Sequence, residues 1–209
     1  MIPVKVLAVR YLANASPALC KALGAPKGYP SLGILTTDCD DATYIALDAA
    51  TKAADVRVSY GRSFYAGAVN ASTPNAGEVI GILAGATPGA VRSGMEAALS
   101  ALQRVGFEAA GEVPYLAHTV SSVGSYLAKE AGVAEGTAIA YLIAPPLEGM
   151  YAMDAALKAA DVKLCKLYAP PSETNFGGGL LSGTQSACDA ACAAFAAAVE
   201  EVAARPLER

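Results

Sequence analysis

Tryptophan is absent from this sequence, histidine occurs once, and charged residues make up only 16% of its 209 residues. Soluble proteins average roughly 25% charged residues, so we expect part of the surface to be apolar and to contact another chain. The 15 basic and 19 acidic residues give a net charge of -4 without a basic run, which argues against a nucleic-acid partner. The sequence has no stretch of about 18 uncharged apolar residues and no N-terminal cleavage signal, so we expect a cytoplasmic protein without a membrane span.

The scarcity of histidine also restricts catalysis. His118 lies in the apolar run YLAHTV, where we interpret it as a hydrogen-bonded structural residue. The five cysteines are an odd number without zinc-like C-x-x-C spacing, so we expect small buried side chains in a reducing compartment. GATPGA and FGGGLL lack a phosphate-loop lysine and dinucleotide-binding spacing. We therefore predict no catalytic residue, no metal ligand and no cofactor.

An internal repeat is the most informative feature that is present. Residues 46–60 read ALDAATKAADVRVSY, residues 152–166 read AMDAALKAADVKLCK, and nine of the fifteen pairs are identical at an offset of 106. The repeat extends upstream, where LAVRYLANASPALCKALGA (7–25) corresponds to LAHTVSSVGSYLAKEAGV (116–133), and downstream into GILAGATPGAVRSGMEAAL (81–99) and GLLSGTQSACDAACAAF (179–195). The sequence therefore predicts two tandem domains, residues 1–109 and 110–209.

Each copy alternates strand and helix patterns. The first predicts strands over 4–10 and 32–36, a short helix after Ser16-Pro17, a strand from 56, a strand over 79–83, and a helix capped by Thr87. Alanines recur at i, i+3, i+4 and i+7 on the repeated helix, a spacing that lets a helix lie close to a sheet (Ala46, Ala49, Ala50, Ala53 and Ala152, Ala155, Ala156, Ala159). We predict an α+β fold made twice, each copy a small sheet with helices on one side.

Two adjacent carboxylates, Asp40 and Asp41, occur only in the first copy, because Pro146-Leu147 stands at the equivalent place. One interpretation is helix capping, since a carboxylate before a helix accepts from its free N–H groups and suits the positive end of its dipole. Capping needs only one carboxylate. The second, together with Glu78, could form an acidic site for a small cation.

The motif AMDAALKAADVKL, a later GGGLL and a capped alanine-rich helix resemble the bacterial microcompartment shell domain. The extra strand and helix ahead of that core resemble its circularly permuted tandem class. Within this class the chain is similar to shell proteins of the ethanolamine-utilisation type, through SLGILTTDCDDATYIALDAATKAADV, YGRSFYAGA, AGEVI, GSYL, YLIAPPLE and PPSETNF. The resemblance implies a shell component without enzymatic activity, a homotrimer that imitates a hexamer, and edge-to-edge tiling with neighbouring shell proteins.

The resemblance also implies two kinds of pore. The loops after Tyr60 and Leu167 would surround a gated central opening, with these residues at the pore: Arg62, Phe64, Tyr65, Gly67, Gly177 and Gly178. Smaller acidic pores would bind a small polar substrate such as ethanolamine through Asp40, Asp41, Glu78, Phe107, Thr174, Asn175 and Phe176. Acidic groups would supply charge-assisted hydrogen bonds, and Phe107 would cover the short carbon chain.

Two other functions stay open at this point. A soluble ligand-binding or sensor protein could bind a small cation through Asp40, Asp41 and Glu78 without assembling. An enzyme could use Cys39 or Cys165 as a nucleophile with His118 as its base.

Overall fold

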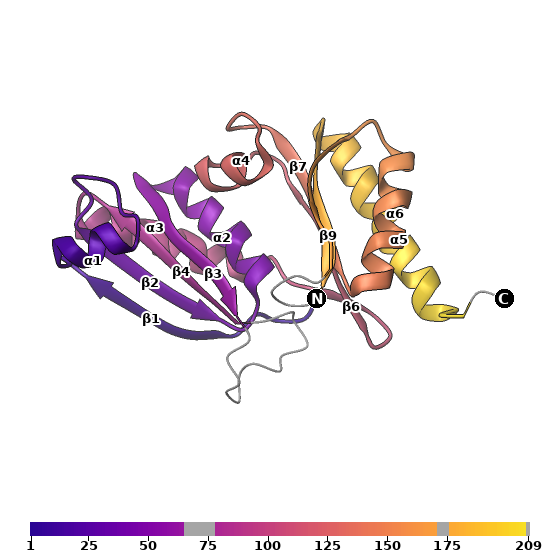
Figure 1. Ribbon diagram of the computed structural model, residues 1–209, viewed down its shortest axis with the longest axis horizontal. Helices are drawn as coiled ribbons and strands as arrows, with labels where there is room; N and C mark the ends of the chain where they lie inside the picture. The colour runs from indigo at the N-terminus through magenta and orange to yellow at the C-terminus, as the bar shows by residue number, and fades with distance from the viewer. Residues whose placement is uncertain (65–77, 171–175, 208–209) are drawn as a thin grey trace. The chain divides into compact units, whose positions relative to one another are not determined.

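The computed structural model describes residues 1–64, 78–170 and 176–207, which form two compact units (Figure 1). The first unit comprises Pro3–Gly106 and Gly124–Leu127, and the second comprises Met1–Ile2, Phe107–Val123 and Ala128–Arg209. The main division at Gly106–Phe107 lies three residues before the predicted boundary at 109–110. Two short segments are grouped with the unit opposite to their place in the sequence, which the repeat alone did not indicate.

The first unit holds a four-stranded antiparallel sheet in the order β1-β2-β4-β3. Its elements run in the order β1 (Val6–Leu12), α1 (Pro17–Ala22), β2 (Ser31–Thr37), α2 (Asp40–Ala53), β3 (Val56–Phe64), β4 (Glu78–Gly85) and α3 (Pro88–Leu102). The predicted strands and helices are therefore all present, with their ends displaced by a few residues.

The second unit holds an antiparallel sheet in the order β5-β6-β7-β9-β8. Its elements are β5 (Glu108–Ala110), β6 (Val113–Val120), α4 (Ser125–Ala131), β7 (Ala138–Ala144), α5 (Pro146–Ala159), β8 (Lys163–Tyr168), β9 (Gly177–Gly183) and α6 (Gln185–Ala204). Strand β5 pairs with β6, so the region that joins the two repeats is a hairpin of the second unit.

Helices α2 and α3 lie against one face of the first sheet at glycine positions. A Cβ atom added at Gly81 would lie 2.6 Å from Leu47 Cδ1 of α2, and one added at Gly33 would lie 2.7 Å from Val91 Cγ1 of α3. Helix α1 packs with Leu32 and Ile82, which alternate with these glycines and so face the other side. The first sheet is thus covered on both faces, whereas the sequence predicted helices on one.

The repeated alanines are buried where the helices cross their sheets. Ala46 and Ala50 of α2 and Ala152 and Ala156 of α5 are all 0% exposed. The last alanines of the pattern, Ala53 and Ala159, are exposed because they end their helices. The small buried side chains allow close helix–sheet packing, as the pattern predicted.

Two threonines cap equivalent helices. The Thr87 side chain accepts from the Ala90 N–H at the start of α3, and the Thr184 side chain accepts from the Ala187 N–H at the start of α6. The predicted cap at Thr87 is confirmed. Ser16 occupies the N-cap position of α1 without a side-chain hydrogen bond.

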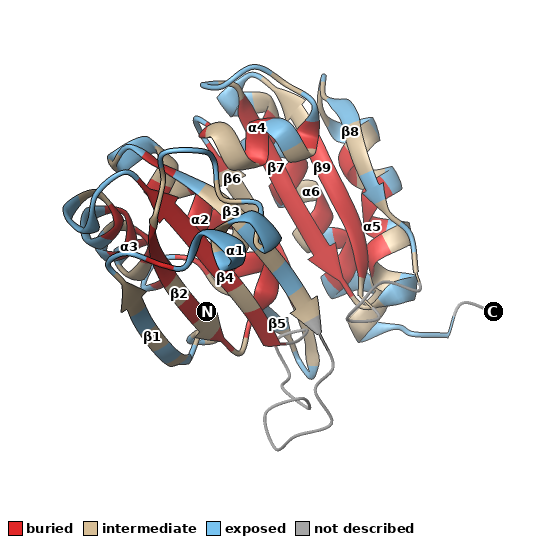
Figure 2. Cartoon of the chain, turned by 60° about the vertical axis from the view of Figure 1, so that its left-hand side comes forward, coloured by how far each residue is buried: buried red, intermediate tan, exposed pale blue. Residues whose placement is uncertain are grey.

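The core of the second unit lies between α5, α6 and the sheet, with Phe195 fully buried at its centre. Figure 2 shows buried residues along β7 and β9 and exposed residues along the edge strand β8. Cys188 and Cys192 lie in this core, and Cys39 is buried in the first unit. These three agree with the predicted buried thiols, whereas Cys20 and Cys165 are only half-buried.

Candidate functional site: a buried acidic cluster at the start of helix α2

Asp40 and Asp41 form the first turn of α2 and are 4% and 6% exposed. The N-cap residue is Cys39, and it makes no side-chain capping bond. Neither aspartate is therefore the N-cap, which corrects the capping interpretation: the helix begins at Asp40, one residue earlier than a cap at Asp40 requires. Instead, the Asp41 N–H donates to Asp40 Oδ1 at 2.9 Å.

Burial raises the pKa of the Asp40 carboxyl well above its usual range, and the charge of Asp41 raises it further. Hydrogen bonds from the backbone at Asp41 and from the Ser63 side chain oppose the shift without cancelling it. All of these donors are neutral. A carboxyl in such surroundings favours either a proton or a nearby cation over an uncompensated negative charge.

Two neighbours of Asp40 were not predicted from the sequence. Ser63 lies near the end of β3, and its side chain hydrogen-bonds both Asp40 and Tyr44. Burial raises the pKa of Tyr44, so its phenol is neutral at physiological pH. A serine in a strand and a tyrosine in a helix do not indicate a binding site by themselves. Only the fold brings Ser63 of β3 to the first turns of α2.

Glu78 begins β4, is 7% exposed, and pairs in register with Phe64. Its Oε1 atom is buried and has no hydrogen-bond partner within the described residues. Val79 pairs with Ser63, and alternation along β4 turns Glu78 to the opposite side from Val79. The described contacts thus join Asp40, Asp41, Ser63 and Tyr44, and place Glu78 at the same end of the sheet without a described bond to either aspartate.

The predicted aromatic residues belong to the second unit. Phe107 is fully buried and its ring meets that of Phe176 edge to face, with centroids 5.9 Å apart. Thr174 and Asn175 lie outside the described residues. The prediction that these groups and the acidic cluster line one small pore stays a prediction.

The predicted central-pore residues fall partly in strands. Arg62 and Phe64 are not in a loop after Tyr60, because β3 continues to Phe64 and pairs with β4. Gly177 and Gly178 are likewise buried in β9, where they pair with Ala144 and Ile143. A Cβ atom at Gly178 would collide with the Leu142 carbonyl oxygen, so this glycine allows the close strand pairing. Tyr65 and Gly67 lie outside the described residues.

Catalysis by a cysteine gains no support from the geometry. Cys39 is 0% exposed, and burial raises the pKa of its thiol well above the usual value, which leaves it protonated and a poor nucleophile. Cys165 donates to the Ser182 hydroxyl in the second unit. The described residues contain no group of three or more His, Cys, Asp or Glu side chains placed to hold a metal ion.

The lining of a surface groove in the second unit includes none of the predicted site residues. The groove is lined by Pro146, Leu147, Met150, Tyr151, Glu201, Val202, Arg205, Pro206 and Leu207. Within the described part of the chain, no helix is long and apolar enough to cross a bilayer.

Residues 31–114 match the BMC domain family. The duplicated α+β fold, in which this match covers most of one copy and the start of the next, defines the class as tandem-domain shell proteins. The chain is 59% identical to the bacterial microcompartment shell protein EutL of Clostridium perfringens over 99% of its own length and 97% of that protein. It is 46% identical to EutL of Salmonella typhimurium, with 100% and 97% of the two chains covered.

A solved structure agrees with these relatives. The ethanolamine utilization protein EutL of Leptotrichia buccalis superposes with a TM-score of 0.94 at 57% identity, covering 100% of this chain and 98% of that one. The chain therefore belongs to the EutL family of bacterial microcompartment shell proteins. The predicted resemblance, the tandem α+β shell fold and the role as a structural shell protein are confirmed.

Proposed function

We propose that three copies of this chain form a homotrimeric ring of six shell domains, which tiles edge to edge with neighbouring shell proteins and catalyses no reaction. The ring encloses a central opening, as the resemblance implies. Low charge suits this role, since the chain carries 16% charged residues and large like-charge fields would oppose close tiling.

The acidic cluster at the start of α2 serves as a binding site for a small cation on its way through the shell. The buried Asp40 carboxyl carries this part of the proposal: its pKa is raised, its donors are neutral, and Asp41 stands beside it. The buried, unpartnered Oε1 of Glu78 at the same end of the sheet gives a second carboxylate oxygen that lacks a donor among the described residues. A bound cation would compensate the negative charge of these buried carboxylates, which the neutral protein groups around them do not.

The cation is a primary ammonium such as protonated ethanolamine, in keeping with the ethanolamine utilization named for the Leptotrichia relative. An ammonium group donates three hydrogen bonds, and the nearby Ser63 and Tyr44 side chains can exchange hydrogen bonds with a hydroxyl.

Light scattering tests assembly, and titration calorimetry tests the site. We expect a mass of about three times 21.0 kDa and heat on adding ethanolamine hydrochloride at pH 7.5. The heat should be lost in Asp40→Asn with Asp41→Asn and kept in Asp189→Asn, an exposed helix aspartate. Ammonium chloride and n-propanol separate the charge from the hydroxyl contribution.

The outcomes separate the two halves of the proposal. A single-chain mass at every concentration contradicts the shell ring and, with binding retained, supports a soluble binding or sensor protein instead. A trimer that gives no heat keeps the shell role and rejects the acidic site.

A further inference from the structure

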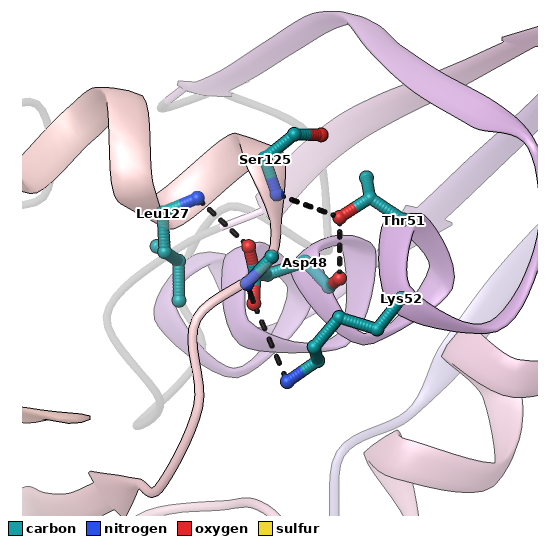
Figure 3. Close-up of polar contacts among 6 residues, drawn as sticks. Asp48, Thr51, Lys52, Ser125 and Leu127 are labelled. Atoms are coloured by element: carbon teal, nitrogen blue, oxygen red, sulfur yellow. Dashed lines mark hydrogen bonds and ion pairs between the residues drawn. The ribbon is translucent and has the colours of Figure 1, made fainter. Parts of the chain in front are cut away.

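A buried aspartate holds a short segment of the chain on helix α2 of the first unit. Asp48 is 0% exposed and accepts from the Gly124 N–H at 2.7 Å and the Leu127 N–H at 2.8 Å (Figure 3). Lys52 lies 3.5 Å from Asp48, and its ammonium group compensates the charge of this buried carboxylate. The two N–H donors precede and follow Tyr126 in the chain, so their bonds fix the backbone on both sides of this residue.

The Tyr126 ring packs on helix α2 and over strand β3. Its centroid lies 6.0 Å from that of the Tyr44 ring, with the two planes tilted by 45°. A Cβ atom added at Gly61 of β3 would lie 3.1 Å from the Tyr126 hydroxyl oxygen and 3.4 Å from Tyr44 Cε1. The absent side chain of Gly61 therefore leaves room for both rings, and each ring limits where the other can lie.

Tyr44 connects this packing to the acidic cluster. The Ser63 side chain hydrogen-bonds both Tyr44 and Asp40, and the Ser63 backbone also hydrogen-bonds Tyr44. Gly61 and Ser63 lie on the same side of β3, because side chains alternate along a strand and the pairing with β4 is regular here. The contacts thus continue from the two tyrosine rings through Ser63 to the Asp40 carboxyl, all within the first unit.

The Ser63 hydroxyl has one proton to share between its two neighbours. It can donate to Tyr44 or to Asp40, but not to both at once. Burial raises the pKa of Tyr44, so the phenol keeps its own proton and can donate it to Ser63 Oγ. When Tyr44 donates in this way, the Ser63 proton is directed to Asp40. The position of the Tyr44 ring therefore decides whether the Asp40 carboxyl has this donor.

The second copy lacks these residues. At the offset of 106 each position has an apolar residue instead, namely Met150 for Tyr44, Leu167 for Gly61, Ala169 for Ser63 and Pro146 for Asp40. The strand register agrees with this offset: Gly61 pairs with Gly81 of β4. Leu167 pairs with Gly179 at the equivalent place of β9. The supporting residues and the acidic pair are thus present together in one copy and absent together from the other, as expected of parts that act together.

We infer that Tyr126 is a positioning residue of the acidic site, an inference that rests on the proposed binding of a small cation there. The bonds to Asp48 hold the Tyr126 ring in place, and this ring holds Tyr44. Tyr44 then directs the Ser63 hydroxyl to Asp40. The Asp40 carboxyl is thereby kept in one orientation, in which it accepts hydrogen bonds from a bound ammonium group without having to reorganise.

Titration calorimetry with ethanolamine hydrochloride at pH 7.5 tests this inference on the full chain. Tyr126→Ala removes the ring and should weaken binding about tenfold. Tyr126→Phe keeps the ring and should bind within about twofold of the unmodified chain. Tyr11→Ala is the matched control, because it removes another half-buried ring from β1, the opposite edge strand of the same sheet, and should leave binding unchanged. Equal binding by Tyr126→Ala and the unmodified chain would overturn the inference.

A double-mutant cycle separates positioning from a general loss of packing. If Tyr126 acts through Ser63, the variant that combines Tyr126→Ala with Ser63→Ala should bind no more weakly than Ser63→Ala alone. Losses that multiply in the double variant would mean that Tyr126 acts independently of Ser63, and would overturn the inference. Circular dichroism of each variant confirms that the fold is retained.

The titration of the Asp40 carboxyl distinguishes a failure of this inference from a failure of the proposed function. Carbon-13 NMR of the unliganded chain follows this carboxyl, with Asp40→Asn to assign its signal. The Ser63 donor favours the charged carboxylate, so Ser63→Ala should raise the pKa of Asp40. Tyr126→Ala should raise it by a similar amount, with no further change in the double variant.

Each outcome decides one of the two ideas. An unmodified chain that gives no heat with ethanolamine rejects the proposed cation site, whereas matching shifts in the two single variants still support the control of Asp40 by Tyr126. If the unmodified chain binds ethanolamine but the Asp40 titration is the same in Tyr126→Ala, the site stands and the positioning role is overturned.

Discussion

Helices α2 and α5 carry the same run of residues, Asp-Ala-Ala-x-Lys-Ala-Ala-Asp-Val, beginning at Asp48 and at Asp154. Ala50 and Ala156, at equivalent places in the two runs, are both fully buried, whereas the first aspartates have opposite surroundings. Asp48 is fully buried beneath Gly124–Leu127, and Asp154 is exposed and pairs only with Lys158 among the contacts described for it. A repeated motif therefore specifies how a helix meets its own sheet, while the segment that covers its outer face decides the role of the same carboxylate.

The largest effect on stability is expected from replacing Asp48, the buried aspartate of the two. Asp48→Ala removes the acceptor of two buried N–H groups and the partner of Lys52, so we expect a loss of about 3 kcal/mol in the free energy of unfolding. Asp154→Ala removes one exposed i,i+4 pair and should change the stability of the single chain by less than about 0.5 kcal/mol. Urea titration measures both.

Dependence on protein concentration separates the two variants further. An effect of Asp154→Ala that grows with protein concentration would reflect lost contacts between copies, because association adds to apparent stability by mass action. The effect of Asp48→Ala should be the same at every concentration. Equal losses in the two variants at high dilution would contradict the difference in burial on which the comparison rests.

Much of the fold could be predicted because the repeat and the periodicity are local signals. Strand alternation, the alanine spacing and the Thr87-Pro88 start of α3 are properties of short windows, and all appear in the structure. The continuation of β3 through Arg62 was missed because glycine and serine in GRSF are turn residues in most contexts, and pairing with β4 overrides that preference here. The exchange of Gly124–Leu127 into the first unit has no local signal at all.

The acidic site was predictable in part for the same reason. Asp40-Asp41 stands out as a pair present in one copy and replaced by proline and leucine in the other. Ser63 and Tyr44 could not be found, since their relation to Asp40 depends on how β3 lies beside the start of α2. Gly177 and Gly178 were placed in a loop because a glycine triplet usually indicates one, whereas β9 uses these glycines for close pairing with β7.

A smaller effect, of opposite sign, is expected at the start of α2, where only the first copy buries aspartates. The pKa of Asp40 in the folded chain lies above the unfolded value of about 3.9. The folded state therefore binds the proton more tightly; this stabilisation is complete below about pH 4 and is lost as the pH rises through the folded pKa. Asp40→Asn cannot ionise and should therefore be more stable than the unmodified chain at pH 7.

Urea titrations from pH 4 to pH 8 check this sign. The advantage of Asp40→Asn should shrink as the pH falls toward 4, because the folded carboxyl is then protonated and the unfolded one is protonated in part. Asp189→Asn, at an exposed helix position, should show no such trend. A variant that is less stable than the unmodified chain at pH 7 would mean that the hydrogen bonds from Ser63 and the backbone outweigh burial and the charge of Asp41. A gain in stability together with lost ethanolamine binding would identify Asp40 as a residue kept for its ligand at the expense of the fold.

The smallest effects are expected at the two threonine caps, where the two copies should behave alike. Thr87 and Thr184 cap α3 and α6 through the same bond, with oxygen to N–H nitrogen distances of 3.1 Å and 3.2 Å. Replacing either by alanine should lower the free energy of unfolding by about 1 kcal/mol, and replacing either by serine, which keeps the acceptor, should cost much less. Because both hydroxyls are on exposed turns, the two losses should agree within roughly 0.5 kcal/mol and add in the double variant. Unequal losses would show that the two copies differ even where their local geometry coincides. The contribution of a threonine cap to stability would then depend on its surroundings, as it does for the aspartates of α2 and α5.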